Sequence, residues 1–256
     1  MSNTENIPVD SLVNGDKKDV EEPETPIETI VIEPDSTIVE LTACRLRAIE
    51  GLDGLTKIET LNMRQNLINK IENVSQLTTL QYIDLYDNHI ERIEGLNTLT
   101  QLKHVDLSFN RISVIENLST LTNVESLFIV HNQLRTIENL STLINLRVLE
   151  LGDNRIKKIE NLESLVQLEE LHFVEHLDNL QSLHQLKELW FNDNQIKNID
   201  ELNKLESMQS LQCIYVHDNP AFDREENYRS KVLLQLKQLT QLNATETRRA
   251  VPMILD

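Results

Sequence analysis

Glycine, cysteine and aromatic residues are all scarce in this chain of 256 residues. It contains 5 glycines and 2 cysteines, and aromatic residues make up 4% of the sequence. We find neither a glycine-rich loop that could cradle a phosphate nor the strained turn that presents a catalytic serine. Cys44 and Cys213 lie in distant repeats, and this separation predicts that they form no disulfide with each other, as is usual in a reducing compartment.

Positive charge and long hydrophobic runs are also in short supply. Lysine and arginine number 24 against 42 aspartates and glutamates, which gives a net charge of -18. Such an acidic chain is not expected to bind nucleic acid or an anionic membrane, so a basic protein surface or a catalytic site with metal ions is a better partner. No apolar run could span a bilayer, no secretory signal begins the chain, and the 7 histidines lack the spacing of a metal site. We therefore predict no metal, no cofactor and no catalytic residues.

Leucine and isoleucine, in contrast, recur with a period of 22 residues. One unit contains Leu80, Ile83, Leu85, Asn88, Ile90, Ile93, Leu96 and Leu99. The pattern L-x-x-L-x-L-x-x-N-x-I-x-x-I-E-x-L-x-x-L-x-x is that of a short leucine-rich repeat. Nine units begin at Ser36, Ile58, Leu80, Leu102, Val124, Leu146, Leu168, Leu186 and Leu211, the last being a half unit.

The positions within the unit predict an α/β solenoid, a curved leucine-rich-repeat array. Side chains alternate along a strand, so positions 4 and 6 point inward and positions 3, 5 and 7 outward. Stacked units then form one parallel sheet on the concave side, and positions 11, 14, 17 and 20 fill the core from the opposite wall. The asparagine at position 9 is predicted to bond the backbone where the chain leaves the strand, with Cys44 as a small buried replacement in the first unit. Asn73, Asn117, Asn139 and Asn161 on the return arc predict capped helical turns.

Three segments are predicted along the chain. Residues 1–35 hold ten acids against two lysines and are expected to be disordered, with residues 26–32 placed to cover the open edge of the first repeat. Residues 36–219 form the solenoid. Residues 220–256 form a C-terminal cap and tail, with an amphipathic helix over residues 228–236 that shields the core of the last repeat.

Two units break the period. The unit from Leu168 to Leu186 has 18 residues and lacks positions 7 to 10 after Phe173, whereas the next unit gains three residues around Ser207. Since the shortened unit loses a position 9 amide, we expect the weakest stacking and the fastest hydrogen exchange between Phe173 and Leu177.

The outward row at position 5 is the candidate functional surface. In order, it reads Glu40, Asn62, Asp84, Asp106, Phe128, Glu150, His172, Trp190 and Tyr215. An exposed Trp190 beside Glu188 and Asp193 is typical of an interface hot spot, although aromatic residues on a strand can simply pack against cross-strand neighbours. The acids at position 15, on the convex side, are interpreted instead as solvated structure offset by nearby basic residues.

Residues outside the core resemble a known family. The similar stretches are TLNMRQNLINKIEN (60–73), IDLYDNHIERIEGL (83–96), VLELGDNRIKKIENL (148–162), LKELWFNDNQI (186–196) and the closing NYRSKVLLQLKQLTQLNAT (227–245). Over residues 36–249 the chain is similar to the leucine-rich-repeat regulatory subunits of type 1 serine/threonine protein phosphatase, the regulatory subunit 7 family. That resemblance implies a non-catalytic subunit of the nucleus and cytoplasm that grips the phosphatase catalytic subunit with its concave face.

The resemblance also transfers individual contacts. The matching contact residues are Glu150, Glu188, Trp190 and Tyr215, with Phe128 as a weaker match and His172 in place of a family aromatic residue. The family usually has about three more repeats, which this chain lacks after Phe173.

The leading hypothesis is therefore a regulatory subunit, monomeric when free, that binds the catalytic subunit of type 1 phosphatase. The residues predicted to bind this partner are Glu150, Glu188, Trp190, Tyr215, Phe128, Asp106, Asp84 and Asp193. A structural adaptor for a cytoskeletal or axonemal partner is the alternative, because it would use the same face for a different basic protein. An enzyme, the third class, has no support in the sequence.

Overall fold

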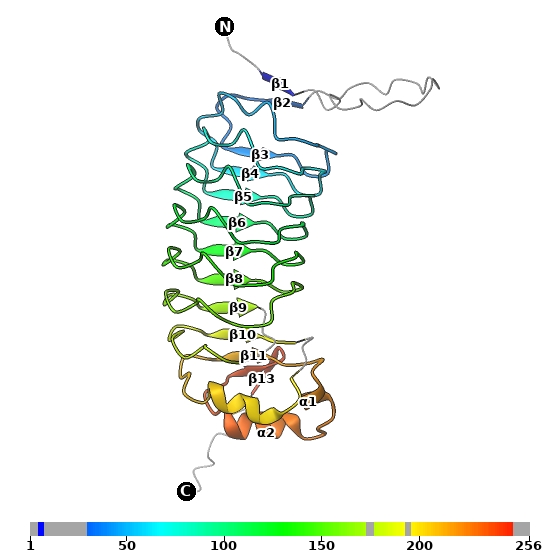
Figure 1. Cartoon of the computed structure of the whole chain (residues 1–256), viewed down its shortest axis with the longest axis vertical. Coiled ribbons are helices and arrows are strands. Elements are labelled where there is room, and N and C mark those ends of the chain that lie inside the picture. The colour runs from blue at the N-terminus through cyan, green and yellow to red at the C-terminus, as the bar shows by residue number, and fades with distance from the viewer. Residues whose placement is uncertain (1–4, 8–29, 173–176, 193–195, 248–256) are drawn as a thin grey trace, which may run out of the picture.

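The computed structural model describes residues 5–7, 30–172, 177–192 and 196–247. It is a single stack of coils in which one sheet runs the whole length (Figure 1). Its strands are β3 (Ile38–Glu40), β4 (Thr60–Asn62), β5 (Tyr82–Asp84), β6 (His104–Asp106), β7 (Ser126–Phe128), β8 (Val148–Glu150), β9 (Glu170–His172), β10 (Glu188–Trp190), β11 (Cys213–Tyr215), β12 (Gln241–Leu242) and β13 (Thr245–Glu246). Neighbours from β3 to β12 are parallel, and only β13 turns back antiparallel.

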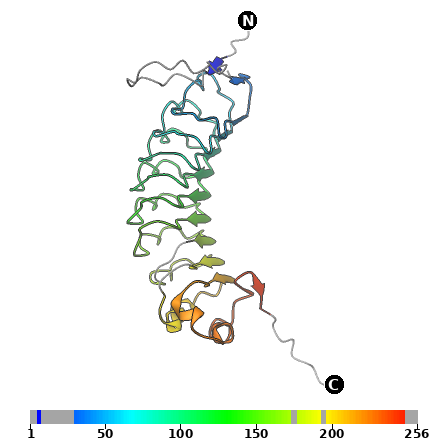
Figure 2. The ribbon, with the colours of Figure 1, turned by 90° about the vertical axis from the view of Figure 1, so that its right-hand side faces the viewer.

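The predicted solenoid is confirmed. Each of the nine units begins its strand two residues after its start, and the strands lie on the inner side of a gentle arc (Figure 2). Position 4 and position 6 side chains, such as Ile83 and Leu85, are fully buried, as are the position 11 and 14 residues Ile90 and Ile93 of the opposite wall. The leucines and isoleucines therefore form one continuous core, which no single unit could bury alone.

The position 9 asparagines bind the backbone of the preceding repeat as well as their own. Asn110 Oδ1 accepts the Ile90 N–H at 2.9 Å, and Asn110 Nδ2 donates to the carbonyl oxygens of Leu85 and Leu107, both at 3.0 Å. The same inter-repeat pair of bonds is made by Asn66, Asn88, Asn132, Asn154 and Asn219. The predicted inward amide is confirmed at these positions, while Asn194 lies outside the described residues. Cys44 is half-buried rather than fully buried.

The return arc differs from the prediction. Asn73, Asn117, Asn139 and Asn161 do not cap helical turns: their φ angles of +56° to +60° are left-handed, whereas an N-cap residue is extended. Each donates its amide to a carbonyl of the preceding repeat, as Asn117 Nδ2 does to the Ile93 oxygen at 2.7 Å. The arc that follows is a pair of turns closed by i to i+3 bonds. Short polar asparagine tolerates the left-handed conformation, and this explains its use here.

The two irregular units stay in the sheet. β9 and β10 pair in parallel with Glu170 opposite Glu188, so the shortened unit keeps the strand register. Asn179 donates to the Ile159 carbonyl at 2.7 Å, which is the role of Asn161 one unit earlier and supports the predicted alignment. Phe173, where we expect weak stacking, lies outside the described residues. The longer unit uses its additional length for the 3-10 helix η1 (Ile199–Leu205).

The N-terminal strands form a sheet of their own. β1 (Glu5–Ile7) pairs antiparallel with β2 (Ile30–Ile32), and neither pairs with β3. Ile32 is only 9% exposed and belongs to the main core, in agreement with a covering role for the segment before the first repeat. Most of residues 1–35 lies outside the described residues, so their disorder stays a prediction.

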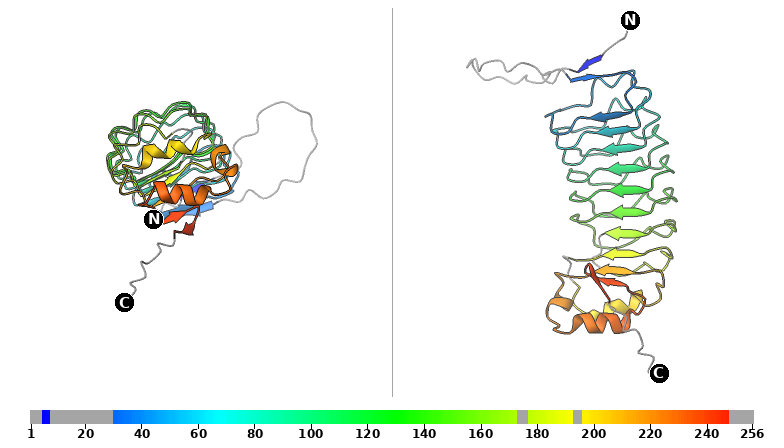
Figure 3. Two further views of the ribbon diagram at one scale, coloured as in Figure 1. Left: turned by 90° about the horizontal axis from the view of Figure 1, so that it is seen from below. Right: turned by 180° about the vertical axis from the view of Figure 1, so that it is seen from behind.

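The C-terminal end is closed by α1 (Pro220–Asp223) and α2 (Tyr228–Gln235), which lie across the end of the stack (Figure 3). The helix predicted at residues 228–236 is confirmed. Asn243 Oδ1 accepts the Val216 N–H at 2.8 Å, and it thereby supplies the last repeat with the acceptor that a tenth unit would otherwise bring. Arg229 fixes the β12–β13 hairpin by donating to the carbonyls of Leu242, Thr245 and Glu246.

We predict that Asn110→Ala lowers the free energy of unfolding by about 2 kcal/mol or more, because it leaves the Ile90 N–H and two carbonyls buried without partners. Urea denaturation followed by circular dichroism measures this loss. The control is Gln101→Ala, which removes an exposed amide and should change stability by less than about 0.5 kcal/mol. Equal losses of stability in the two variants would contradict this role of the position 9 asparagines.

A substitution at Gly95 tests whether the return arc requires a left-handed backbone conformation. Its φ is +73°, and a Cβ atom there would stand 2.6 Å from the Ile71 carbonyl oxygen. We expect Gly95→Ala to destabilise the protein by about 1–3 kcal/mol, from dihedral strain together with this clash. Gly152→Ala is the matched control, since its Cβ would meet only a Val130 methyl group at 3.9 Å. A thermal melt that shows the same midpoint for both variants would rule out the explanation.

Candidate functional site

Four position 5 side chains form a continuous row over the C-terminal half of the sheet. The strand register sets Glu150 beside His172, His172 beside Trp190, and Trp190 beside Tyr215. The rings stack, with centroids 4.4 Å apart for His172 and Trp190 and 4.0 Å apart for Trp190 and Tyr215. All four side chains are half-buried. The sequence prediction that Glu150, Trp190 and Tyr215 share one surface therefore agrees with the geometry.

Carboxylates border this aromatic row. Glu150 Oε1 lies 3.0 Å from His172 Nδ1, and Glu188 accepts a hydrogen bond from Trp190 Nε1. Glu170 Oε2 lies 3.9 Å from His172 Nε2, a buried atom with no hydrogen-bond partner among the described residues. The rings are thus held in fixed orientations by their acidic neighbours. Such a surface can receive basic side chains through ion pairs with the carboxylates and through packing against the exposed edges of the rings.

Cys213, at position 3 of the same end of the sheet, is not suited to nucleophilic chemistry. It is 4% exposed, and burial raises the pKa of its thiol to about 11, with the charge of Glu188 acting in the same direction. The thiol is therefore protonated at neutral pH, whereas a reactive cysteine needs its thiolate form.

A second aromatic group covers the N-terminal half of the sheet. Tyr82 stacks on His104 with a centroid distance of 4.1 Å, and His104 contacts Phe128 at 5.0 Å. Burial lowers the pKa of His104, so the ring is neutral at pH 7. Phe128, predicted to bind the partner, packs within this group, and it also lies beside Glu150 in the strand register. The two groups therefore meet on the sheet where Phe128 lies beside Glu150.

The prediction for Asp84 is wrong. Its side chain is 1% exposed, because Arg64 pairs with Oδ2 at 3.0 Å and the Tyr86 N–H donates to Oδ1 at 3.0 Å. A carboxylate whose two oxygens are occupied and covered in this way cannot meet an incoming protein without breaking its ion pair with Arg64. The alternation rule placed it outward, but Arg64 from the preceding repeat covers it.

Asp106, the next acid in the row, has no basic partner among the ion pairs of the described residues. It is half-buried, and this burial raises the pKa of its carboxyl group even though the backbone N–H of Ser108 donates to it. Asp193, the remaining predicted contact, lies outside the described residues.

Several of the convex acids pair with basic side chains. Arg92 holds Glu116 through two bonds of 3.0 and 3.2 Å, while Lys70 pairs with Glu72 and Lys158 with Glu160 at the surface. Exposed pairs of this kind contribute little energy. Their geometry agrees with the interpretation of this row as solvated structure.

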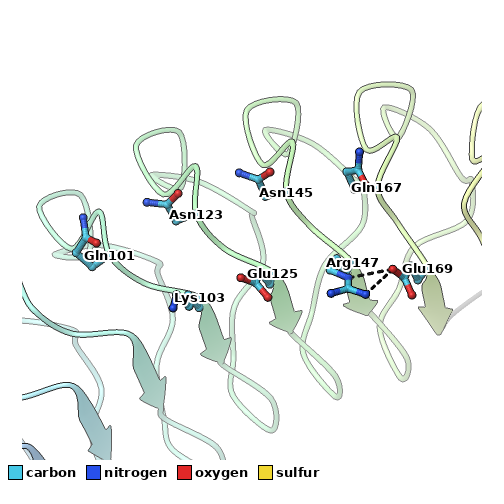
Figure 4. A pocket seen from close by; sticks show the side chains of 8 residues that line it. All are labelled: Gln101, Lys103, Asn123, Glu125, Asn145, Arg147, Gln167 and Glu169. Atoms are coloured by element: carbon cyan, nitrogen blue, oxygen red, sulfur yellow. Dashed lines mark hydrogen bonds and ion pairs between the residues drawn. The ribbon is translucent and has the colours of Figure 1, made fainter.

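A shallow groove runs along one flank of the stack, between the turns and the strand starts (Figure 4). It is lined by Gln101, Lys103, Asn123, Glu125, Asn145, Arg147, Gln167 and Glu169. Arg147 donates to Glu169 at 2.6 Å, and the Asn123 and Asn145 amides donate to carbonyls of the preceding repeat. These groups mostly tie one repeat to the next, which is why we assign the groove no ligand.

Within the part of the chain that the structure describes, no three His, Cys, Asp or Glu side chains gather as metal ligands would. No helix among these same residues has the length and apolar character needed to cross a bilayer.

Comparison with known proteins agrees with the repeat architecture. A family model described as "Leucine Rich repeats (2 copies)" matches residues 78–113 and 100–142. An internalin of Listeria monocytogenes superposes with a TM-score of 0.66 at 23% identity, over 79% of this chain and 59% of that one. The chain has the fold of a leucine-rich-repeat protein.

Two further structures show the same leucine-rich-repeat fold. A leucine-rich-repeat protein of Leptospira interrogans gives a TM-score of 0.64 at 20% identity, over 79% of this chain and 59% of that one. Internalin C2 of Listeria monocytogenes gives 0.60 at 22% identity, over 84% of both chains. At these identities the likeness concerns the fold alone.

One sequence match is closer but short. Over 48 residues, 19% of this leucine-rich-repeat chain, the sequence is 44% identical to the protein phosphatase 1 regulatory subunit 7 of Danio rerio. The matched stretch spans only 14% of that protein's length. Solenoids of this kind typically present extended concave surfaces that bind other proteins.

We predict that Asp106→Asn stabilises the protein at neutral pH. Because the folded state raises the pKa of this carboxyl group above its ordinary value of 3.8, the folded state binds the proton more tightly, and its stability falls as the pH rises through and above that value. Asparagine keeps the acceptor for the Ser108 N–H without the buried charge. Thermal melts from pH 3.5 to 7 should show a higher midpoint for the variant at pH 7 and a smaller decline with pH. The exposed Asp153→Asn is the control, and a lower midpoint for Asp106→Asn at pH 7 would refute the assignment.

Proposed function

We propose that this chain is a non-catalytic scaffold whose concave face binds the catalytic subunit of type 1 serine/threonine protein phosphatase. The observation that carries the proposal is the row of Glu150, His172, Trp190 and Tyr215, which presents stacked rings with acidic neighbours on one face. Support for the identity of the partner comes from the 48-residue likeness to the phosphatase regulatory subunit of Danio rerio.

Physical chemistry favours this row as the centre of an interface. Trp190 and Tyr215 are large aromatic side chains whose orientation is already fixed by stacking, so little side-chain entropy is lost when they are covered. Glu150 and Glu188 add negative charge beside the rings, and the whole chain carries a net charge of -18. Both features suit a partner with a basic surface, whose approach such a charge accelerates. An interface over several strands of this face would bury about 2,000 Å² in total.

The residues proposed to contact the phosphatase are Glu150, Glu188, Trp190, Tyr215 and Phe128, with Asp106 at the N-terminal border. Asp84 is omitted because it is buried against Arg64. We further propose that the free protein is monomeric and acts in the nucleus and cytoplasm, where the partner would be met.

The alternative is a structural adaptor that presents the same acidic and aromatic face to a cytoskeletal or axonemal protein. An affinity experiment with the full chain separates the two. Recovery of the phosphatase catalytic subunit supports our proposal, and recovery of tubulin or motor subunits without it supports the adaptor.

For the phosphatase, we expect Trp190→Ala to weaken binding by about 2 kcal/mol or more, roughly thirtyfold, because the central ring of the stack is removed. Titration calorimetry with purified catalytic subunit measures the affinity, and circular dichroism checks that the fold is retained. Ile144→Ala is the control, since Ile144 is a 53% exposed apolar residue outside the position 5 row. Wild-type affinity of the Trp190 variant would remove this row from the interface.

A further inference from the structure

A second line of aromatic side chains runs beside the position 5 row. It consists of Tyr86, Phe109 and His131, at positions 7 and 8 of successive repeats, and is called here the aromatic ridge. Tyr86 and Phe109 have ring centroids 4.8 Å apart, and Phe109 stacks on His131 at 4.6 Å with 19° between the planes. None of these rings stacks on Tyr82, His104 or Phe128 among the ring contacts of the described residues. The ridge is therefore separate from the surface discussed above.

Phe109 occupies a backbone position that a bulky residue normally avoids. Its φ is +56°, in the left-handed region, and the other described residues at position 8 are Ala43, Gln65, Asp87, His131, Asp153 and Asp218. Asparagine, aspartate and glycine accept this conformation with less strain than phenylalanine. The Phe109 side chain is also 37% exposed. A large apolar ring that is both strained and exposed is poorly explained by folding, and such outliers often mark functional sites.

An arginine of the same chain, Arg64, already contacts the first ring of the aromatic ridge. The guanidinium carbon of Arg64 lies 4.2 Å from the Tyr86 ring centroid, and the same guanidinium pairs with Asp84 at 3.0 Å. An arginine thus lies on the first ring of the ridge while its charge is met by a carboxylate. Phe109 and His131 have no arginine over them in the described part of the chain, although they continue the same line of rings.

Carboxylates stand at both ends of the Phe109–His131 pair. The position 8 N–H of each of these repeats donates to the position 7 carbonyl of the next repeat, as from Asp87 to Ser108 and from His131 to Gly152. This register places Asp87 one repeat before Phe109 and Asp153 one repeat after His131, at a spacing of about 4.8 Å for each step. Asp153 Oδ2 lies 4.0 Å from His131 Nδ1, and its side chain is 74% exposed. Arg111 and Arg155 lie two residues further along their repeats, beyond the inward asparagines, so the two flanks of the ridge differ in charge.

We propose that the aromatic ridge is a second docking site, which binds an arginine side chain of an extended segment in a partner protein. The guanidinium lies on the face of His131 that is turned away from Phe109 and pairs with Asp153, as Arg64 lies over Tyr86 and pairs with Asp84. Arg111 and Arg155 repel a second basic residue on the outer flank, so the segment runs along the inner flank. This inference is independent of the phosphatase proposal, because the proposed site uses none of the residues proposed to contact the phosphatase.

The test uses the full chain and the peptide acetyl-Gly-Arg-Gly-Arg-Gly-amide, with norleucine in place of arginine as the control peptide. We expect the arginine peptide to shift the NMR ring signals of Phe109 and His131 in a saturable way, while the norleucine peptide leaves them unchanged. Phe109→Asn and Asp153→Asn should each weaken the arginine peptide by about fivefold or more. Glu188→Gln, on the position 5 row, should leave its affinity unchanged. An absence of ring shifts, or equal shifts with norleucine, overturns the proposal.

The melting temperature of the Phe109→Asn variant provides a second test, because it should not fall when peptide binding is lost. Since asparagine suits the left-handed position, Phe109→Asn should melt at or above the temperature of the wild-type protein while losing the arginine peptide. If Phe109 served only packing, the variant would melt several degrees lower and the remaining sites would bind the peptide as before. That pair of results would overturn the proposal, and it would leave the outcome for Trp190 and the phosphatase unaffected.

Discussion

A regular repeat of this solenoid leaves a backbone N–H and a carbonyl group buried where its strand ends, and the next repeat supplies their partners. The position 9 asparagine does this with one side chain, since Asn110 accepts from Ile90 and donates to Leu85 of the repeat before it. Unpaired, these groups would cost more than the bonds contribute when made. The requirement explains why the units stack in a fixed register. It also explains the cap, where Asn243 closes the series by accepting the Val216 N–H.

The fixed register has consequences for every outward row. Residues 22 apart become neighbours at the spacing of strands, so the chemistry of each side chain depends on the residues one unit away. Trp190 lies between His172 and Tyr215 and stacks on both rings. Asp84 instead pairs with Arg64 and is buried beneath it, while Asp106, one unit on, forms no such ion pair and has a raised pKa. Two aspartates at the same position of successive repeats, Asp84 and Asp106, therefore have different roles.

Because of this dependence between repeats, only part of the fold and of the candidate site could be predicted from the sequence. The 22-residue period was sufficient for the strands, the inward leucines and the inward amides, because each follows from position within the unit. It also brought Glu150, Trp190 and Tyr215 onto one face. Burial of Asp84 was missed because it is decided by a long side chain from another unit, which alternation along a strand does not consider. The left-handed Asn117 was mistaken for a cap because both roles favour asparagine, and only the backbone dihedral distinguishes them.

The asparagines that link the repeats and the outward rows are therefore constrained by different physical requirements. Asparagine or glycine stands at the left-handed arc position of the regular repeats because the backbone requires it, and the same holds for the inward amides. Positions 5 and 7 have no such requirement, so they differ from one repeat to the next and can be specialised without loss of stacking, whereas position 8 is left-handed. Phe109 shows the limit of that freedom: it occupies a position where the backbone prefers a small polar residue, and the cost falls on one repeat rather than on the whole array. A fold whose stability comes from contacts between neighbouring repeats can tolerate such a local cost, and this allows a single face to carry more than one binding surface.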